Sequence, residues 1–420
     1  MRARARESRN LRSEDCRPKE NGNVNTRRKT SSRLGDYFDL SILSLSHSFS
    51  DGFTSLLAPV LVLILAEFDL SAFDAGVLLS VSGMATFLLV FPISIGADLS
   101  GRRTEILVVG LTLASGAYLS MLYTGTFAFL VLLAFVAQAG NAVFHPCGTA
   151  LVTERFRARK AVAISVFAMA GNIGTTGFPL VQGIAAELVG WRFSVAMFAV
   201  PMAVLLPLIR FRYRSGALDR RQHSQSSLLR QSLDLTRAVF NNKSVLALGS
   251  VYALTSMASR TSKGFLPVLA AQRFSMNAAA IGLTISVYYG VGIASKGLAA
   301  IMYRRLGARA ALRVLLVLSL LGTVGFLVVA RPVWLIIVAG VAGLAHSVSP
   351  IILVATSDSS DRTILTSSVG LIYWMHSIGF VGPFFGGVIA SQLGLPFTYI
   401  FGATLFFLAV CTTQLIRRGR

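Results

Sequence analysis

An imidazole and a carboxylate stand four positions apart within the first long apolar stretch of the chain. His47 and Asp51 belong to the run SHSFSDGF, and four residues make about one turn of a helix, so both side chains lie on one face. An ionisable group inside such a stretch is functional by default. We interpret Asp51 as a proton carrier and His47 as the neighbour that shares the proton. The alternative is a polar contact that only holds this helix to another.

Two cations interrupt a later apolar stretch. Arg260 and Lys263 lie three positions apart in SMASRTSKGFLP, at about the same depth as Asp51. One carboxylate neutralises only one of them, and an unpaired charge in a low-dielectric site is costly. We therefore predict an anionic substrate, such as a phosphonate, a phosphate ester or a carboxylate, bound by Arg260 through two hydrogen bonds and by Lys263 as a point charge. The alternative is that Lys263 reaches water and Arg260 only pairs with Asp51.

Further polar residues within apolar stretches complete the candidate set. His145 precedes Pro146, which removes a backbone hydrogen bond and predicts a kink with a polar lining. We assign His145 and His376 as further candidate substrate-binding residues, although residues such as His376 and His346 are more often hydrogen-bonded core residues than ligands. Lys296 is expected to extend to the membrane surface. The spacing of His and Cys residues predicts no metal site and no disulfide.

The composition identifies an integral membrane protein. The 420 residues are 54% hydrophobic and only 14% charged, which is too apolar for two soluble domains. Apolar runs of about 20 residues or more recur along the chain, each long enough to cross a bilayer. We predict twelve spans, over residues 39–66, 73–97, 104–123, 126–151, 160–187, 191–209, 244–271, 278–302, 310–329, 332–356, 364–391 and 396–416.

The charges divide the chain into regions and orient it. The net charge is +21, but the Lys and Arg residues gather on one side of the predicted spans, so we infer a cytoplasmic side there rather than nucleic-acid binding. Of the remaining basic residues, three lie on the opposite side (Arg192, Arg273 and Arg331) and three lie within spans (Arg260, Lys263 and Lys296). The regions are a basic tail (1–38) that cannot fold alone, a first half (39–209), a cytoplasmic linker (210–243), a second half (244–416) and a cytoplasmic tail (417–420).

A polar turn between the second and third spans carries a family resemblance. It reads SIGADLSGRR and includes Asp98, Gly101, Arg102 and Arg103. This D-x-x-G-R-R pattern resembles the loop between the second and third helices of the major facilitator superfamily of transporters, with Ser94 in place of the family's leading glycine. The resemblance implies a gate at the cytoplasmic mouth, in which Asp98 can pair with arginines of its own loop or with Arg155 of the next inner loop.

The two halves of the chain repeat each other. At an offset of 206, Gly76 and Gly101 fall on Gly282 and Gly307, and at an offset near 204, Gly190 falls on Gly394. The resemblance implies an all-α membrane protein with the major facilitator fold, in which twelve transmembrane helices form two six-helix halves around a central site.

A narrower resemblance covers residues 40–190. The H-x-x-x-D pattern of the first span, the run Phe144–Pro146 and AGNIG at 170–174 resemble the fosmidomycin-resistance branch of the superfamily, which exports drugs by proton antiport. A glutamate often follows the histidine-proline pair in that branch, whereas Cys147 stands here, so one proton carrier is missing.

These observations favour a secondary transporter of the bacterial inner membrane that couples protons to the efflux of small organic or drug-like molecules, anions among them. The alternatives are a proton-coupled importer of an organic anion or metabolite and, from another class, a non-transporting membrane sensor. No phosphate-binding loop or catalytic set is present in the sequence, so we expect a proton gradient as the energy source, with no cofactor and no enzymatic activity. Both termini are expected in the cytoplasm, the protein is expected to be a monomer, and the identity of the substrate stays open.

Overall fold

The structure, a computed structural model, describes residues 33–213, 240–360 and 365–416, and every regular element in these ranges is a helix. The basic tail up to residue 32, most of the predicted linker, residues 417–420 and the side chain of Asp98 lie outside this description. The first group of helices comprises α1 (Arg33–Phe53), α2 (Leu57–Glu67), α3 (Ala72–Ser100), α4 (Arg103–Ser120), α5 (Phe127–Asn141), α6 (Phe144–Arg155), α7 (Lys160–Ala196) and α8 (Ala199–Arg212).

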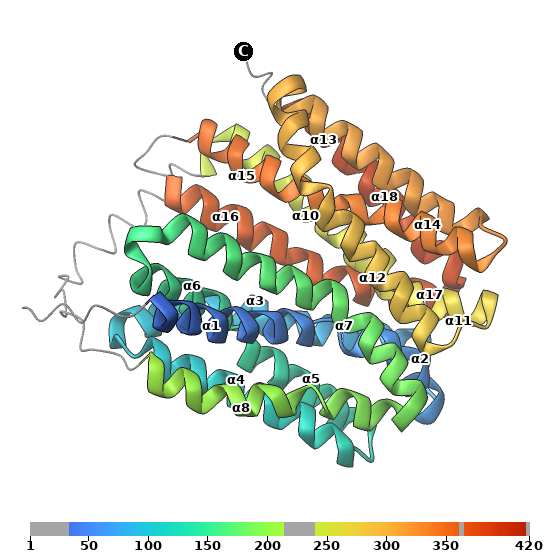
Figure 1. Cartoon of the computed structure of the whole chain (residues 1–420). Helices are drawn as coiled ribbons and strands as arrows, with labels where there is room; N and C mark the ends of the chain where they lie inside the picture. The colour runs from blue at the N-terminus through green and yellow to red at the C-terminus, as the bar shows by residue number, and fades with distance from the viewer. Residues whose placement is uncertain (1–32, 214–239, 361–364, 417–420) are drawn as a thin grey trace, which may run out of the picture.

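The second group comprises α10 (Lys243–Gly264), α11 (Leu266–Phe274), α12 (Ala278–Ala294), α13 (Lys296–Val328), α14 (Pro332–Gly343), α15 (Val348–Asp358), α16 (Leu365–Ser377), α17 (Gly382–Leu393) and α18 (Leu395–Thr412). Figure 1 shows the first group, coloured blue to yellow-green, below the second group, coloured yellow to red.

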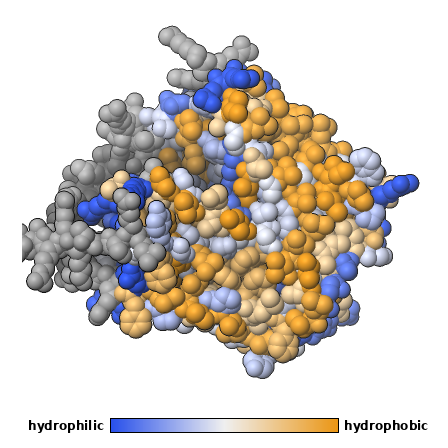
Figure 2. Space-filling model, in the orientation of Figure 1, coloured by the Kyte–Doolittle hydropathy of each residue, from blue (hydrophilic) through white to orange (hydrophobic). Residues whose placement is uncertain are grey.

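The helices are suited to a lipid environment. In the described part of the chain, nine helical segments are long and apolar enough to cross a membrane. Large apolar side chains on their outer faces are exposed, for example Leu188, Phe193 and Val328. Hydrophobic residues cover most of the face drawn in Figure 2, and hydrophilic ones gather toward its ends. Such a surface is stable only where hydrocarbon replaces water.

The predicted repeat has a counterpart in the backbone. Four glycines have positive φ in the described residues: Gly101 at 65° and its repeat mate Gly307 at 77°, and Gly190 at 79° with its mate Gly394 at 100°. Glycine tolerates these angles because it lacks a Cβ. Each ends or sharply bends a helix, so the chain turns at matching positions in both groups.

The two groups are packed together at one end, which we call the Glu67 end, where α2 stops and α3 begins. A Cβ added at Gly76 of α3 would lie 2.6 Å from the carbonyl oxygen of Pro383, and one added at Gly282 of α12 would lie 2.2 Å from that of Pro179. Both distances are below van der Waals contact, so only glycine permits this approach. Gly76 and Gly282 are a repeat pair, hence the two contacts are equivalent.

The core follows the same arrangement. One buried cluster joins residues of the first group, such as Phe53 and Tyr118, to residues of the second group near the Glu67 end, such as Phe265 and Tyr288. A second cluster, which includes Leu248, Leu316 and Ile352, lies entirely within the second group. The groups therefore share a core at the Glu67 end, whereas toward the opposite end, at the Gly101 turn, the second group has a core of its own.

Candidate functional site

A cavity of about 1280 Å³ lies between the two groups of helices. Its walls come from α1, α3, α5, α6 and α7 on one side and from α10, α12, α13 and α16 on the other. It extends toward the Gly101 turn, where Ser94, Arg103 and Glu154 line it. Most of the residues predicted for the site reach this cavity, namely Asp51, His145, Arg260, Lys263 and His376.

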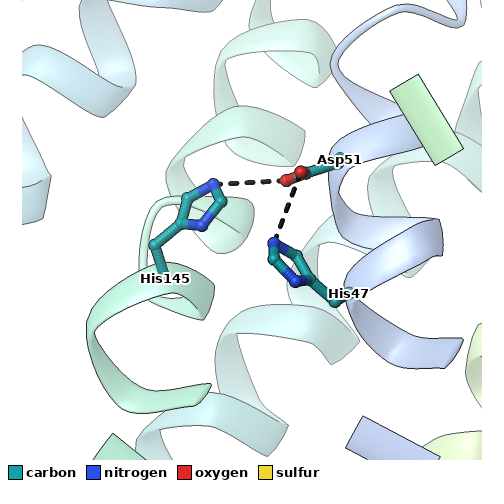
Figure 3. Close-up of side chains that lie close together, drawn as sticks. All are labelled: His47, Asp51 and His145. Atoms are coloured by element: carbon teal, nitrogen blue, oxygen red, sulfur yellow. Dashed lines mark ion pairs between the residues drawn. The ribbon is translucent and has the colours of Figure 1, made fainter. Parts of the chain in front are cut away.

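His47, Asp51 and His145 form one cluster, which we call the His–Asp–His cluster. Nε2 of His47 lies 3.3 Å from Oδ2 of Asp51, and Nε2 of His145 lies 3.2 Å from Oδ1 of the same carboxylate. Figure 3 shows both imidazoles directed at Asp51, His47 from one turn earlier on α1 and His145 from α6. The structure therefore brings His145, predicted as a substrate ligand, to the predicted proton carrier.

The hydrogen bond of His47 fixes its proton. Nδ1 lies 2.7 Å from the backbone oxygen of Phe167, and a carbonyl oxygen only accepts, so Nδ1 carries the hydrogen. In the neutral ring, Nε2 then holds a lone pair, and this atom is buried without a hydrogen-bond partner. A lone pair against a carboxylate is unfavourable. The contact becomes attractive when a cation, such as a proton on Nε2, lies between the two groups.

Packing holds the cluster in place. The His47 ring stacks between Phe144 and Phe167, with centroids at 5.2 and 4.1 Å. A Cβ added at Gly171 of α7 would lie 2.5 Å from Oδ2 of Asp51 and 2.7 Å from Nε2 of His47. Gly171 therefore leaves the space that the cluster occupies. The side chains become progressively more accessible, with 7% of His47, 19% of Asp51 and 57% of His145 exposed.

The cations of α10 lie on the opposite wall of the cavity. The Arg260 guanidinium lies 3.5 Å from the centroid of the Phe380 ring, and its Nε donates a hydrogen bond to Ser256 Oγ at 3.1 Å. Lys263 donates a hydrogen bond to the hydroxyl of Tyr289 and lies 4.5 Å from the centroid of that ring. No ion pair joins either cation to a carboxylate within the described residues, and the ion pairs of Asp51 there are with the two histidines rather than with Arg260.

Lys296 differs from expectation. The sequence predicted that its side chain extends to the membrane surface, but it lines the cavity instead and interacts electrostatically with Asp51. A long amphipathic side chain satisfies its charge in any accessible water, and a linear pattern does not reveal that the nearest water lies in a cavity. Lys296 is the functional candidate that sequence reasoning underestimated.

The other two cavity histidines sit among aromatic rings. His376 packs against Tyr252 with centroids 4.2 Å apart. His346 contacts Tyr288 and Tyr289, and its Nδ1 is buried without a hydrogen-bond partner. The assignment of His376 as a substrate ligand stays a prediction, since it lines the cavity without a charged partner in the described structure.

The residues predicted for the gate lie around the Gly101 turn. Arg103 forms an ion pair with Glu154 at the cavity wall. Arg155 pairs with Asp39 at 2.7 Å and with Asp36 at 3.5 Å. Asp39 is almost fully buried and also accepts a hydrogen bond from Arg212 at 2.5 Å. Arg102 is exposed. Arg155 thus joins α6 to α1, while the side chain of Asp98, its predicted partner, lies outside the description.

A helical membrane protein with a cavity lined by charged side chains between two packed groups of helices has the architecture of a solute transporter. The comparisons agree with this class. Residues 43–330 and 248–418 match the Major Facilitator Superfamily, and the chain belongs to that family. The family and its transporter neighbours indicate a protein that moves solutes rather than an enzyme.

Several individual proteins resemble this chain. The fosmidomycin resistance protein of Escherichia coli (strain K12) is 26% identical over 170 residues, which are 40% of this chain and 41% of that protein. A bacterial homologue of the human lysosomal transporter Spinster, in an inward-facing and occupied conformation, superposes with a TM-score of 0.81 at 14% identity over 92% of this chain and 97% of the other. The nucleoside transporter NupG gives a TM-score of 0.74 at 16% identity, over 91% of this chain and 100% of the other. At these identities the two structures establish the fold alone.

Proposed function

We propose that this protein is a proton-coupled secondary transporter of the bacterial inner membrane that exports small organic anions. The observation that carries the proposal is a cavity with the His–Asp–His cluster on one wall and, on the other, Arg260 and Lys263, which form no ion pair with a carboxylate among the described residues.

We infer twelve membrane-spanning helices in two six-helix halves, with both termini in the cytoplasm. Two of the nine apolar segments, Val162–Arg212 and Ala278–Val328, are 51 residues long, enough for two crossings each. Gly190 and Gly307 bend them, and each has a repeat mate with positive φ, Gly394 and Gly101 respectively. The helix pair α10–α11 supplies the remaining span, in which Arg260 and Lys263 lower the hydropathy. The excess of Lys and Arg near the Gly101 turn supports a cytoplasmic location for that end.

Protons are the coupling ion in this proposal. Since His47 Nδ1 is committed to Phe167, the contact of Nε2 with Asp51 is stabilised when a proton is shared between them. His145 lies on the other side of Asp51 and borders the cavity, so it can pass a proton to and from cavity water. In this proposal His47, Asp51 and His145 together take the role of the glutamate that Cys147 replaces.

An anionic substrate would neutralise the positive charges on the opposite wall of the cavity. Arg260, Lys263 and Lys296 bring three positive charges to the cavity. The described contacts of Arg260 and Lys263 are with hydroxyls and aromatic rings, and Lys296 interacts electrostatically with Asp51. A bound phosphonate, phosphate ester or carboxylate would supply the missing counter-charge, with two hydrogen bonds from the guanidinium. Efflux is favoured over import by the relative from Escherichia coli, whose name refers to drug resistance.

Transport in proteoliposomes with an imposed proton gradient tests the proposal. The panel comprises fosmidomycin, a phosphate monoester and an aromatic carboxylate, together with a neutral and a cationic compound of similar size. We expect the anions alone to move, in the direction opposite to the protons. Movement with the protons would identify an importer, and preference for the cationic compound would reject the anion site.

A further inference from the structure

The His–Asp–His cluster has the composition of a transition-metal site. One ligand atom from each of His47, Asp51 and His145 can be chosen so that all three lie within 4.8 Å of one another. Ligands of a tetrahedral zinc ion, at about 2.0–2.1 Å from the metal, lie about 3.3 Å apart. The two contacts of Asp51 measure 3.3 Å at Oδ2 and 3.2 Å at Oδ1, so binding through one carboxylate oxygen requires a rotation of the carboxylate and a closer approach of the two imidazoles.

We propose that this cluster binds one divalent transition-metal ion, with Nε2 of His47, Nε2 of His145 and the Asp51 carboxylate as its three protein ligands. Two imidazoles and one carboxylate suit Zn²⁺, Co²⁺ or Ni²⁺, whereas Ca²⁺ and Mg²⁺ prefer sites made of oxygen atoms alone.

The surroundings of His47 prepare it as a ligand. Metal-bound histidines usually donate their other ring N–H to a carbonyl or a carboxylate, which fixes the tautomer. His47 does so through Nδ1 and the Phe167 carbonyl. The atom left for the metal, Nε2, is buried, faces Asp51 and has no hydrogen-bond partner in the described structure. A divalent ion at this point would satisfy both the lone pair and the carboxylate.

The cluster also has an entrance and an open coordination position. His145 and Asp51 line the cavity, and more than half of the His145 side chain is accessible from it. Three protein ligands leave a fourth position for water or for a donor atom of a cavity ligand. The glycine at position 171 keeps the space beside Oδ2 and Nε2 free, since a Cβ there would stand within 2.7 Å of both atoms.

The charge balance sets the expected affinity. Asp51 is the cluster's single anionic group, and Lys296 of α13 interacts with it electrostatically. A positive charge near a divalent ion weakens its binding. Removal of Lys296 should therefore strengthen metal binding, while the same change should weaken binding of an anionic substrate, which gives the two ligands opposite responses.

Metal binding goes beyond the proposed function, but one of its consequences rests on that function. A bound ion would occupy the atoms that hold the coupled proton, so Zn²⁺ should inhibit gradient-driven transport. Direct binding of the metal does not depend on whether the cluster couples protons, and the two claims can fail separately.

Titration of the full-length protein with Co²⁺, followed by its visible absorption, tests the site. The protein is purified in detergent without a histidine tag, because such a tag would bind the probe. We expect one equivalent of Co²⁺ with a spectrum of four- or five-coordinate geometry, displaced by Zn²⁺. His145→Ala should weaken binding at least about tenfold, and the variant should fold, because more than half of the His145 side chain is exposed to the cavity. Lys296→Gln should strengthen binding severalfold.

His346→Ala is the matched control, since His346 also lines the cavity but lies outside the cluster. It should bind Co²⁺ as the unaltered protein does. Absence of a specific spectrum at millimolar Co²⁺, or equal losses in His145→Ala and His346→Ala, would overturn the metal site. If Co²⁺ binds as expected but Zn²⁺ leaves transport unchanged, the metal site stands and the proton-coupling role of the cluster fails.

Discussion

Replacement of Gly171 by alanine probes the His–Asp–His cluster without removing any of its groups. The new Cβ would lie 2.5 Å from Oδ2 of Asp51 and 2.7 Å from Nε2 of His47. The His47 ring cannot withdraw easily, because it is stacked between two phenylalanines and its Nδ1 is bonded to Phe167. The substitution must therefore displace the carboxylate, the imidazole or helix α7.

The expected magnitude follows from the cost of overpacking, which is about 1–3 kcal/mol for one added group in a filled site. Since about 1.4 kcal/mol corresponds to a factor of ten, transport should fall by about 5- to 140-fold if the strain acts on the geometry of the cluster. Alanine is also the better helix former by up to about 1 kcal/mol, so thermal stability should decrease by less than the overpacking cost alone.

Gly177→Ala provides the control on the same helix, because a Cβ at Gly177 meets no atom within 4 Å. Both variants gain the same helix propensity, but only Gly171→Ala crowds the cluster. Initial rates of gradient-driven transport in proteoliposomes, normalised to the amount of folded protein, should be low for Gly171→Ala and unchanged for Gly177→Ala. Equal rates in the two variants would refute the role of Gly171 and the geometry assigned to the cluster.

Three further predictions concern other parts of the molecule. Arg260→Lys and Lys263→Gln should each weaken binding of a phosphonate or carboxylate about tenfold or more, since Lys cannot form the two parallel hydrogen bonds of a guanidinium; calorimetry showing unchanged affinity in both, with loss of stability only, would reject the anion site. Arg155→Gln should lower the free energy of unfolding by about 1–3 kcal/mol, because Asp39 is buried and loses one of its two arginines. The control Arg210→Gln, whose contact with Glu105 is long and exposed, should lower it by less than about 1 kcal/mol. Equal denaturation midpoints of the two variants would contradict this prediction. Asp98→Asn should lower the transport rate by shifting the balance between inward-open and outward-open states while leaving substrate affinity in the favoured state nearly unchanged, and a turnover equal to that of the unaltered protein would reduce the Asp98 loop to a topology marker.

The sequence predicted the fold class well because membrane helices leave strong linear signals. Long apolar runs, turns of charged residues and glycines at a constant offset depend on local physics alone. The same glycines turn out to have positive φ at Gly101 and Gly307, and close helix contacts at Gly76 and Gly282. Both the positive φ angles and the close contacts depend on the absence of a Cβ, and a glycine is visible directly in the sequence.

The site was predicted only in part, because its contacts join residues far apart in the chain. The pairing of His47 with Asp51 follows from helical spacing. The approach of His145 depends on how α6 packs against α1, and the orientation of Lys296 depends on the presence of a water-accessible cavity beside α13. The sequence prediction missed the group of possible metal ligands formed by His47, Asp51 and His145 for the same reason, since no local motif contains His145 together with the other two.

The central claim is that Asp51 carries the coupled proton, and substrate-induced proton movement tests it most directly. A pH-sensitive dye inside proteoliposomes reports protons that move when an anionic substrate is added, and exchange of labelled for unlabelled substrate is measured in parallel. The account predicts proton movement with the unaltered protein, none with Asp51→Asn, and substrate exchange in both, because exchange needs no net proton transfer. His47→Ala should retain part of the proton movement with an altered pH profile. Proton movement by Asp51→Asn at the rate of the unaltered protein would contradict the account.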